Sequence, residues 1–339
     1  MGVRTQQAEN PGWGAPLAGY QRDLVGAHLL LVNRLLKRSA KTDFAQFEPR
    51  NQMERRIVLS LHRIETGRVS ELATLLGHDL AQVSRALRGL RNCGLVMRDS
   101  PREPYRLTPQ GWELGDLMDV VALRREAELN RGFGLQQMFE LAGMLGVMQR
   151  RASEILAVEM QGGPSSANTG MAGRGQVPLV QSLPIELASR VQSAITSLAT
   201  TIARAATLAY KRQTGLSSYE WRVIANVAAR LEVTFVGLVA HVGSDKAQVS
   251  RALDSLVSSG LLARVRADRA GPESIVLTPL GVETHAVLLA DALRRSAVLL
   301  SDLKASQRQR LQTYLNRLIA NATSMADRAE AGVEPGSGD

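Results

Sequence analysis

The sequence predicts a mainly α-helical protein with small β wings, built as two tandem copies of one unit. Three observations lead to this fold class. The heptapeptide Ala-Gln-Val-Ser-Arg-Ala-Leu occurs at Ala81–Leu87 and again, unchanged, at Ala247–Leu253. Matched positions continue around both copies without a gap, from Glu54/Glu220 to Arg98/Arg264. The stretch Leu-Thr-Pro-Gln-Gly after the first copy is answered by Leu-Thr-Pro-Leu-Gly after the second. A repeat of this length and order indicates a tandem duplication.

Length and composition agree with two folded domains. The chain has 339 residues, of which 45% are hydrophobic and only 4% aromatic, so the cores must be mainly aliphatic. The one cysteine, Cys93, excludes an intramolecular disulfide and any zinc site that needs several cysteines. No apolar run reaches the ~18 residues of a membrane span, and no signal-peptide core is present. We therefore expect a cytoplasmic protein that does not contact membranes.

The charge balance points to an anionic partner. The formal net charge is +9 and the isoelectric point is about 10.3, with the basic excess shared by both halves of the sequence. That distribution favours folded modules that contact phosphates over a polybasic arm.

Composition also predicts the domain limits. A segment rich in Gly, Ser, Pro and Asn, with almost no charge, separates the two copies as a flexible linker. Its glycines make no phosphate loop, because no Gly-Lys-Ser/Thr follows them. The expected parts are a loose arm over 1–20, a first domain over 21–160, the linker over 161–184, a second domain over 185–330 and a disordered tail over 331–339.

The first copy begins with helices that apolar spacing and capping residues delimit. Ser70 can cap the third helix, which ends at Gly77, and Asp79 can cap the fourth, which ends before Gly94. The order of two short helices joined by a tight turn is that of a helix-turn-helix, and the fourth helix is its recognition helix. The four expected helices span 23–37, 53–63, 71–76 and 80–92.

A β-hairpin and two long helices follow. The strands Leu95–Arg98 and Tyr105–Leu107 bracket a proline-bearing turn, which predicts a hairpin, or wing. Thr108 as N-cap, with a proline after it, starts a long helix that runs to about Arg131. A last helix is expected from Leu135 to about Met160.

The same succession restarts in the second copy. The expected helices span 185–212, 219–229, 236–242, 246–258, 279–303 and 306–328, with the second hairpin over 262–277.

The repeated helix has an apolar side and a polar side, which suits the major groove of DNA. Arg85 and Arg88 face outward, as does Gln82. Arginine can reach guanine N7 and O6, and glutamine can pair with adenine, each worth about 1 to 3 kcal/mol of discrimination. The apolar side consists of Val83, Ala86, Leu87 and Leu90.

Several assignments stay open at this level. Gln82 lies three residues after Asp79, so it fits a capping box as well as base reading. Ser84 can donate to a phosphate or bond back to its own helix. Whether Arg85 and Arg251, the strongest candidates, contact bases or phosphates is also left open.

Arginines of the two wings could enter a minor groove, although nearby acids partly neutralise these loops. The candidate DNA-binding residues are Gln82, Ser84, Arg85, Arg88, Arg98 and Arg102 in the first copy, and Lys246, Gln248, Ser250, Arg251, Arg264, Arg266 and Arg269 in the second.

Each half resembles a MarR-family winged-helix transcription regulator over nearly the whole chain apart from arm, linker and tail. The residues that carry the resemblance in the second copy are Glu220–Ile224, Val249–Arg251, Gly260–Leu262, Asp268–Arg269 and Leu277–Gly281. Those in the first copy are Arg56–Val58, Val83–Arg85, Gly94–Val96 and Leu107–Gly111. The order and spacing of these motifs, found twice, make the resemblance specific.

The resemblance implies a transcription regulator that binds double-stranded DNA. A repressor is expected, and activation is the alternative left open. Members of the family usually form homodimers whose first and last helices interlock, whereas this sequence holds two units in one chain. A linker of about 23 residues can span roughly 75 Å, so a single-chain pseudo-dimer is geometrically allowed. A homodimer of chains is the alternative.

The copies differ at the edges of the recognition helix, where Leu80 corresponds to Lys246, Arg88 to Asp254 and Arg91 to Val257. We therefore expect an imperfect palindrome with half-sites ~34 to 36 Å apart.

The resemblance further implies control by a small, often aromatic acid or phenol. Residues that could border its pocket are Arg56, Trp112, Tyr210, Trp221 and Arg222. Core packing is the competing interpretation for the two tryptophans. The competing function is a winged-helix scaffold, or an architectural DNA-binding protein, without small-molecule control.

Other chemistry finds little support in the sequence. Cys93 lies at the end of the recognition helix, with Ser259 as its counterpart, which argues against a redox sensor. The histidines show no paired ligand spacing, so no metal site is expected. Neither a nucleophile-base-acid pattern nor a carboxylate pair stands out, so we predict no enzymatic activity and no cofactor.

Overall fold

The computed structural model describes residue 17 and residues 19–47, 51–162, 190–243, 245–266 and 273–331. Most of the expected arm, linker and tail therefore lies outside the described residues, and so do Asp268 and Arg269 of the second wing. The chain forms two compact units, each described here by itself. The first unit combines residues 28–208 with 295–339, and the second combines 1–27 with 209–294.

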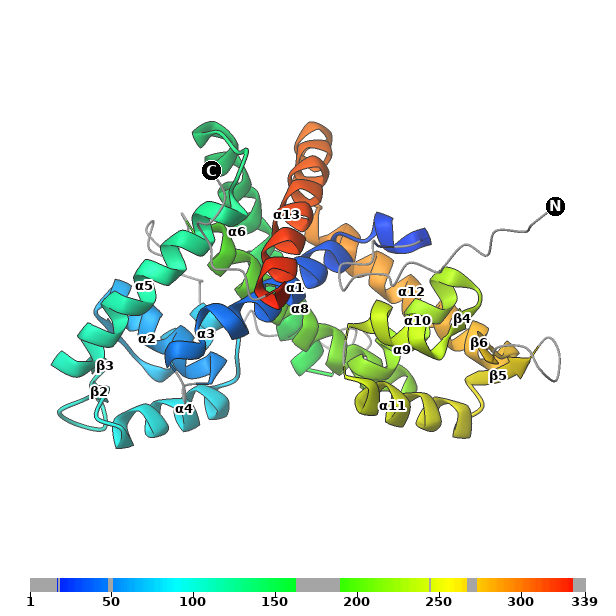
Figure 1. Ribbon diagram of the computed structural model, residues 1–339, viewed down its shortest axis with the longest axis horizontal. Coiled ribbons are helices and arrows are strands. Elements are labelled where there is room, and N and C mark those ends of the chain that lie inside the picture. Colours follow the sequence, from blue (N-terminus) through cyan, green and yellow to red (C-terminus); the bar gives the residue numbers. More distant parts are fainter. Residues whose placement is uncertain are drawn as a thin grey trace, which may run out of the picture. The chain divides into compact units, whose positions relative to one another are not determined.

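The first unit carries the first copy of the helix-turn-helix and its wing (Figure 1). A helix precedes it and two long helices follow it, and the last helix of the chain together with parts of two others from the second half of the sequence completes the unit. Its elements are α1 (Val25–Asp43, from residue 28), η2 (Ala45–Phe47), α2 (Gln52–Ile64), β1 (Thr66–Gly67), α3 (Val69–Leu76), α4 (Leu80–Asn92), β2 (Val96–Met97), β3 (Tyr105–Leu107), α5 (Pro109–Leu129), α6 (Leu135–Met160), α8 (Val191–Thr214, to residue 208) and α13 (Ala305–Ala331).

The second unit repeats the helix-turn-helix and wing. Its elements are η1 (Gly19–Asp23), α9 (Ser218–Arg230), β4 (Val233–Thr234), α10 (Phe235–Val242), α11 (Lys246–Ser258), β5 (Leu262–Arg266), β6 (Glu273–Leu277) and α12 (Pro279–Leu299, to residue 294). Gln21 of η1 donates from Nε2 to the Ala225 carbonyl of α9 at 3.4 Å, so this unit also joins both halves of the sequence.

Each wing belongs to a three-stranded antiparallel sheet, ordered β1-β3-β2 in the first unit and β4-β6-β5 in the second. Val96 pairs with Leu107 in the first sheet, and Leu262 pairs with Leu277 in the second. The hairpins confirm the prediction, whereas β1 and β4 were not expected. They are two residues long, and a strand that short has no periodic pattern to read.

Non-glycine residues with positive φ precede these extra strands at equivalent positions. Glu65 ends α2 with φ of 63°, and Leu231 ends α9 with φ of 64°. Such a conformation is rare for residues with a side chain and turns the chain sharply. The turn carries the next residues along the sheet edge before the following helix begins.

The core of the helix-turn-helix in the first unit is aliphatic, as composition predicts. Three helices contribute fully buried side chains to it: Ile57, Val58 and Leu61 from α2, Leu72 and Leu76 from α3, and Val83, Leu87 and Leu90 from α4. The apolar side predicted for the recognition helix is therefore confirmed. Burying each such side chain stabilises the unit by roughly 1.5 to 3 kcal/mol relative to exposure.

Most helix limits match the expectations closely, and α4, α6 and α11 match at both ends. The first helix, expected to end at residue 37, continues to Asp43. The expected cap of α3 is wrong. Arg68, not Ser70, occupies the N-cap position, and its backbone N–H donates to the Glu71 carboxylate at 2.8 Å. Because β1 brings the chain in as far as Gly67, the helix starts one residue before Ser70.

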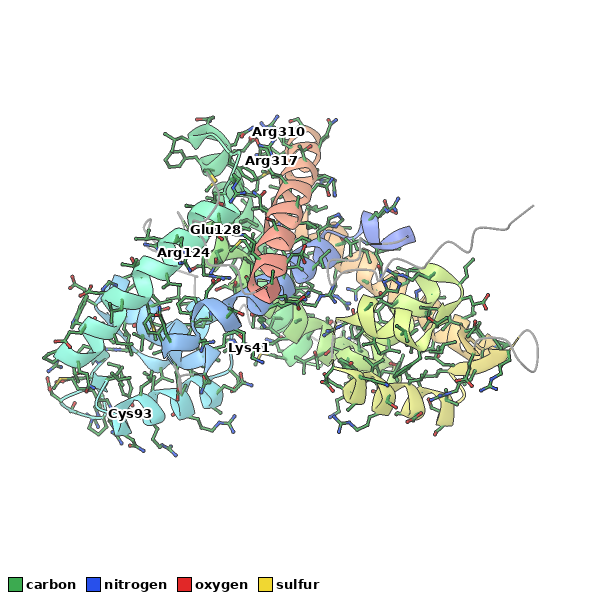
Figure 2. All side chains as sticks on the ribbon, in the orientation of Figure 1. Lys41, Cys93, Arg124, Glu128, Arg310 and Arg317 are labelled. Atoms are coloured by element: carbon green, nitrogen blue, oxygen red, sulfur yellow. The ribbon has the colours of Figure 1, made fainter. Side chains whose placement is uncertain are left out.

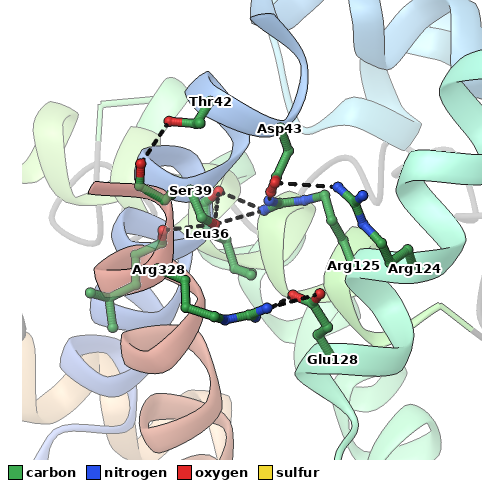
Figure 3. Close-up of polar contacts among 10 residues, drawn as sticks. Leu36, Ser39, Thr42, Asp43, Arg124, Arg125, Glu128 and Arg328 are labelled. Atoms are coloured by element: carbon green, nitrogen blue, oxygen red, sulfur yellow. Dashed lines mark hydrogen bonds and ion pairs between the residues drawn. The ribbon is translucent and has the colours of Figure 1, made fainter. Parts of the chain in front are cut away.

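A buried polar cluster joins α1, α5 and α13 in the first unit (Figure 3). Arg125 of α5 is fully buried, donates to the Leu36 carbonyl at 2.9 Å and to Ser39 Oγ at 3.0 Å, and pairs with Asp43. Burial lowers its pKa to about 10. A charge without partners at such a site would cost several kcal/mol, so the three acceptors are needed for this packing.

The C-terminal helix is bound to the same cluster. Arg328 of α13 donates to the Glu128 carboxylate of α5 at 2.6 Å, and Thr42 of α1 donates to the Ala329 carbonyl at 3.4 Å (Figure 3). Asn321 donates to the Leu129 carbonyl at 2.8 Å. The last helix of the second half thus packs within the unit that holds the first winged helix. None of the helices in the described part of the chain is both long and apolar enough to cross a membrane.

Candidate nucleic-acid interface

Two local features determine where α4, the recognition helix of the first unit, begins. Gly77 ends α3 with φ of 71°, a left-handed conformation that glycine adopts without steric cost. Asp79 then caps α4 by accepting from the Gln82 backbone N–H at 2.7 Å. Together they produce the tight turn that presents α4 on the surface of the unit.

The exposed side of α4 is basic. Arg85, Arg88 and Arg91 are three residues apart and all exposed, and the described residues place no carboxylate against them. Leu80 at the first helical position is 57% exposed. Arg91 was not a DNA-binding candidate in the sequence, where it only marked a position at which the two copies differ. Because its side chain is exposed beside Arg88, it joins the candidate surface.

Gln82 does not close a capping box. Its Oε1 lies 2.9 Å from His78 Nδ1, and only its backbone N–H bonds to Asp79. Burial lowers the pKa of His78, and the nearby positive charges of Arg56, Lys37 and Arg204 lower it further. The hydrogen bond to Gln82 acts in the opposite direction and raises this pKa. Ser84 is half-buried, and within the described residues it makes no bond back to its own helix.

The second recognition helix, α11, has the same cap and a different polar side. Asp245 accepts from the Gln248 N–H at 2.8 Å, and Lys246, Gln248 and Arg251 are exposed. Asp254, however, lies where α4 has Arg88. It accepts from Arg264 at 2.6 Å and from the half-buried Ser250 at 3.5 Å.

Most of the wing arginines that were predicted to contact DNA make contacts within the wing itself. Arg98 donates to the Pro101 carbonyl at 2.9 Å and lies 4.7 Å from the centre of the Tyr105 ring. Arg264 and Arg266 donate to Glu273 at 3.2 and 3.5 Å.

Arg102 is exposed in the first wing and has no partner within the described residues. Arg106, which was not a candidate, forms a two-pronged bond to Asp99, both distances being 2.8 Å. Because contacts across the hairpin decide which wing arginines are occupied, the sequence could not separate Arg102 from Arg98.

The aromatic candidates for a ligand site pack in different places. Trp221 is 9% exposed and packs 5.4 Å from Tyr210 and 5.4 Å from His285, between ring centres. Arg222 lies over the Tyr219 ring at 5.3 Å, and burial lowers its pKa. These contacts are those of core side chains in the second unit.

Trp112 lies on the surface of the first unit, next to a histidine of α2. Its side chain is 37% exposed and its ring lies 4.9 Å from His62, on the surface of the first unit.

A cavity of about 100 Å³ does exist in the first unit. It lies among α1, α2, α3, α5 and α8, and Arg56 is the one effector candidate that lines it. Apolar lining comes from residues such as Phe44 and Leu76. Arg63, Arg190 and Gln192 also line the cavity but were not among the candidates. The last two lie at the start of α8, in the other half of the sequence, and only the fold brings them to this cavity.

The cavity has an excess of buried positive charge. Arg63 and Arg190 share the carboxylate of Asp119, at 2.8 and 3.2 Å. Arg190 Nη1 is buried without a hydrogen-bond partner. Burial lowers the pKa of Arg56 to about 10, and its guanidinium donates to Ser197 Oγ at 3.1 Å.

The polar balance of the cavity favours an anion. Burial raises the pKa of Glu126, which accepts from the Gln192 N–H at 3.1 Å, and Gln192 Oε1 is buried without a partner. An unpaired buried donor is costly, so an acceptor oxygen of an anion would satisfy Arg190 Nη1, whereas Gln192 Oε1 is itself an acceptor and needs a donor.

The described residues show no metal-binding site, and the one cysteine is a surface residue. Within the described residues, no group of three or more His, Cys, Asp or Glu side chains could hold a metal ion. Cys93 is exposed at the C-terminal end of α4 (Figure 2).

Comparison with known proteins identifies one part of the chain. A sequence model of the MarR family matches residues 214–271, which contain α9, β4, α10, α11 and β5. No curated protein gives a significant match.

Solved structures show partial similarity. A MarR/EmrR family transcriptional regulator from Acinetobacter sp. ADP1 is 22% identical, with a TM-score of 0.38 over 42% of this chain and 99% of that one. A MarR family transcriptional regulator from Silicibacter pomeroyi DSS is 24% identical, with a TM-score of 0.34 over 38% and 85%. Another from Silicibacter pomeroyi is 25% identical, with a TM-score of 0.31 over 34% and 80%.

Residues 214–271, which hold the second helix-turn-helix with its recognition helix α11, are therefore the part of this chain that is similar in sequence to the MarR family.

Proposed function

We propose that the chain is a sequence-specific repressor that reads an imperfect palindrome of double-stranded DNA through α4 and α11 of one polypeptide. The observation that carries this proposal is the pair of capped recognition helices with exposed Arg85 and Arg251 at the same position of each. An outward arginine in the middle of such a helix has the reach for a guanine edge or a phosphate.

The interleaving of the two halves supports a single-chain pseudo-dimer. In the first unit, Ser197 of α8 donates to the Leu75 carbonyl of α3 at 2.8 Å, and Arg204 donates to the Gly77 carbonyl at 3.2 Å. Helix α8, from the second half of the sequence, thus packs against the helix-turn-helix of the first half. One chain supplies the interlocked helices that two chains supply in a homodimeric regulator.

Stoichiometry tests this arrangement. Operators are selected in vitro from random duplexes, and the chain is titrated into a selected duplex at concentrations far above the dissociation constant. Saturation at one chain per duplex is expected. Saturation at two chains per duplex, at concentrations at which the free chain is monomeric, would mean that two chains share one operator, and the pseudo-dimer would be wrong.

The unlike polar sides of α4 and α11 provide a second test. Replacing the half-site read by α4 with the one read by α11, and the reverse, should reduce affinity to different extents, because Arg88 and Asp254 cannot favour the same contacts. Equal losses would contradict unlike half-sites.

An architectural role is the competing function, and the same titrations separate the two. Binding to phosphates alone gives a steep salt dependence and the same affinity for selected and random duplexes. A selected operator that binds no better than random DNA would favour that alternative.

We further propose that a small aromatic acid relieves repression by binding the cavity of the first unit. Its carboxylate would meet Arg190 Nη1 and the guanidinium of Arg56, and its ring would meet the apolar wall. At about 100 Å³ the cavity is smaller than the ~150 Å³ that takes up benzene, so a lining side chain must move to admit a ring.

Calorimetry with benzoate tests the site, with uncharged benzamide as the matched ligand. Arg56→Gln should weaken benzoate binding by about tenfold or more, the worth of a charge-assisted hydrogen bond. Arg222→Gln, at the equivalent position of the second copy, should leave it unchanged. Equal binding of benzamide, or equal effects of the two variants, would contradict an anion site in the first unit.

A further inference from the structure

The outer face of α5 carries an apolar stripe on which none of the described residues packs. Leu117 is 61% exposed, Val120 is 68% exposed and Leu123 is 50% exposed, all on the side of the helix that faces away from the first unit's core. Scattered exposed apolar side chains are ordinary, but three on one helical face form a contiguous surface, and such surfaces mark interaction sites.

An open groove of about 740 Å³ lies beside this stripe. It runs between α5 and the short helix η2, and Phe47, Leu95, Leu114 and Val121 supply much of its lining together with Leu117 and Val120. Apolar side chains from a partner helix could enter it and remove both surfaces from water, at about 25 cal/mol for each Å² of apolar area.

Charged residues flank the stripe in a two-fold pattern. Glu113 lies before it in the sequence, and Arg124, which Figure 2 labels, lies after it. Leu117 and Val120 are equally far from the midpoint between Met118 and Asp119, and so are Glu113 and Arg124. If a second α5 lies antiparallel about that midpoint, Leu117 of each helix meets Val120 of the other, and Glu113 of each meets Arg124 of the other.

Both charges are available for such a contact. Glu113 is exposed and makes no ion pair within the described residues. The side chain of Arg124 is 41% exposed and reaches Asp43 only at 3.4 Å, while Arg125 already pairs with that carboxylate. Releasing Arg124 therefore leaves Asp43 with a partner.

We propose that two copies of this chain associate through an antiparallel pair of α5 helices, with Leu117 and Val120 at its centre and Glu113–Arg124 ion pairs at its ends. The pairing is self-complementary, as a two-fold interface requires. One helix pair with an adjoining groove buries less than the ~1,200 Å² of a small stable interface, so the association should be weak, with a dissociation constant on the order of micromolar.

Such a dimer would join two DNA-bound chains. Two operators near one another would hold the chains at a high effective concentration, so a weak contact would be sufficient for cooperative binding. The contact lies on the side chains of α5 and does not use the recognition helices, so a single operator should not require it.

The first test follows mass with concentration by light scattering, from ~1 to ~100 µM around the expected dissociation constant. The wild-type chain should pass from monomer to dimer in this range, and Leu117→Glu/Val120→Glu should stay monomeric. Val287→Glu/Ala290→Glu, the equivalent change in α12, should dimerise as the wild type does. A wild-type chain that is monomeric throughout, or a dimer that the α5 variant does not dissociate, overturns the proposal.

The second test uses charge complementarity. Glu113→Arg alone places two arginines at each end of the pair, and Arg124→Glu alone places two glutamates there, so each variant should be monomeric. Mixed together, they should form a heterodimer, because each end again has one charge of each sign. Two folded variants that fail to associate on mixing would exclude the antiparallel register.

A DNA-binding measurement on the α5 variant distinguishes a failure of this proposal from a failure of the proposed function. Leu117→Glu/Val120→Glu should bind a single operator with the wild-type affinity and lose cooperativity only on a duplex with two operators. Loss of single-operator binding in this variant, with its fold intact by circular dichroism, would show that α5 serves DNA binding itself and not association.

Discussion

The recognition helices α4 and α11 have the same apolar side and different polar sides. Four buried residues of each correspond one to one, and the capping bonds from Asp79 and Asp245 differ in length by only 0.1 Å, at 2.7 and 2.8 Å. The exposed sides differ, because Arg88 is available in α4 while Asp254 in α11 holds a wing arginine. Packing therefore conserved one face of a duplicated helix, and the face that could meet DNA diverged.

The contact between each recognition helix and the second helix of its copy also differs. Ser255 of α11 donates to the Glu220 carboxylate at 2.9 Å, whereas α4 has Gly89 at that position. A side-chain carbon added at Gly89 would lie 2.9 Å from Glu54 Oε1, the end of a flexible side chain that can move. The second copy thus has a hydrogen bond between its second helix and its recognition helix, and the first copy lacks the side chain that would make it.

The largest effect is expected where the two helices agree. Arg85→Ala and Arg251→Ala should each weaken operator binding by about 1 to 3 kcal/mol, since each removes the central arginine of one recognition helix. Titration of the selected operator by fluorescence anisotropy measures both. A loss in one variant only would mean that the shared arginine does not have the same role in both copies.

A smaller effect is expected where the polar sides differ. Arg88→Asp should lower affinity for all duplexes and reduce the slope of log K against log salt by about 0.9 if Arg88 contacts a phosphate. Asp254→Arg should raise affinity for random DNA. The slope of Arg88→Asp decides whether this arginine reads bases or phosphates, and an unchanged affinity would remove Arg88 from the interface.

Exchange of the residues beneath the helices should alter stability and leave DNA contacts intact. Gly89→Ser should stabilise the first unit by about 1 kcal/mol, from better helix propensity and a new bond to Glu54. Ser255→Gly should destabilise the second by a similar amount. Urea unfolding measures both; a destabilising Gly89→Ser would mean that Glu54 cannot move aside.

The smallest effect concerns pH, because His241 of α10 corresponds to Leu75 of α3. Burial, aided by the charge of Arg230, lowers the pKa of His241 to about 4, and its Nδ1 is buried without a hydrogen-bond partner. The unfolded chain therefore binds more protons between pH 6.5 and 4, and the second unit loses stability as pH falls through that window.

His241→Leu should remove this dependence. After allowance for solvent screening we expect it to stabilise the second unit by about 1 kcal/mol at pH 5 relative to its effect at pH 7. Trp221 fluorescence reports unfolding of this unit, with Trp112→Phe to remove the signal from the first. The same gain at both pH values would contradict a titrating His241.

The sequence by itself determined the duplication, the fold class, the hairpins and the apolar side of the recognition helices. These features depend on neighbours within a few residues: apolar spacing, the caps Asp79, Asp245 and Thr108, and the glycines that end helices. Local rules suffice there because a helix or hairpin makes most of its backbone bonds to itself.

The tertiary structure alone decided which charged groups are available. Arg98 and Arg102 look alike in the sequence, and a cross-hairpin contact occupies only Arg98. Arg125 looks like a surface residue beside Arg124, yet α1 supplies the acceptors that bury it. The cavity depends on Arg190 from the other half of the sequence. The state of a charged side chain depends on partners that are distant along the chain, and only packing brings those partners together.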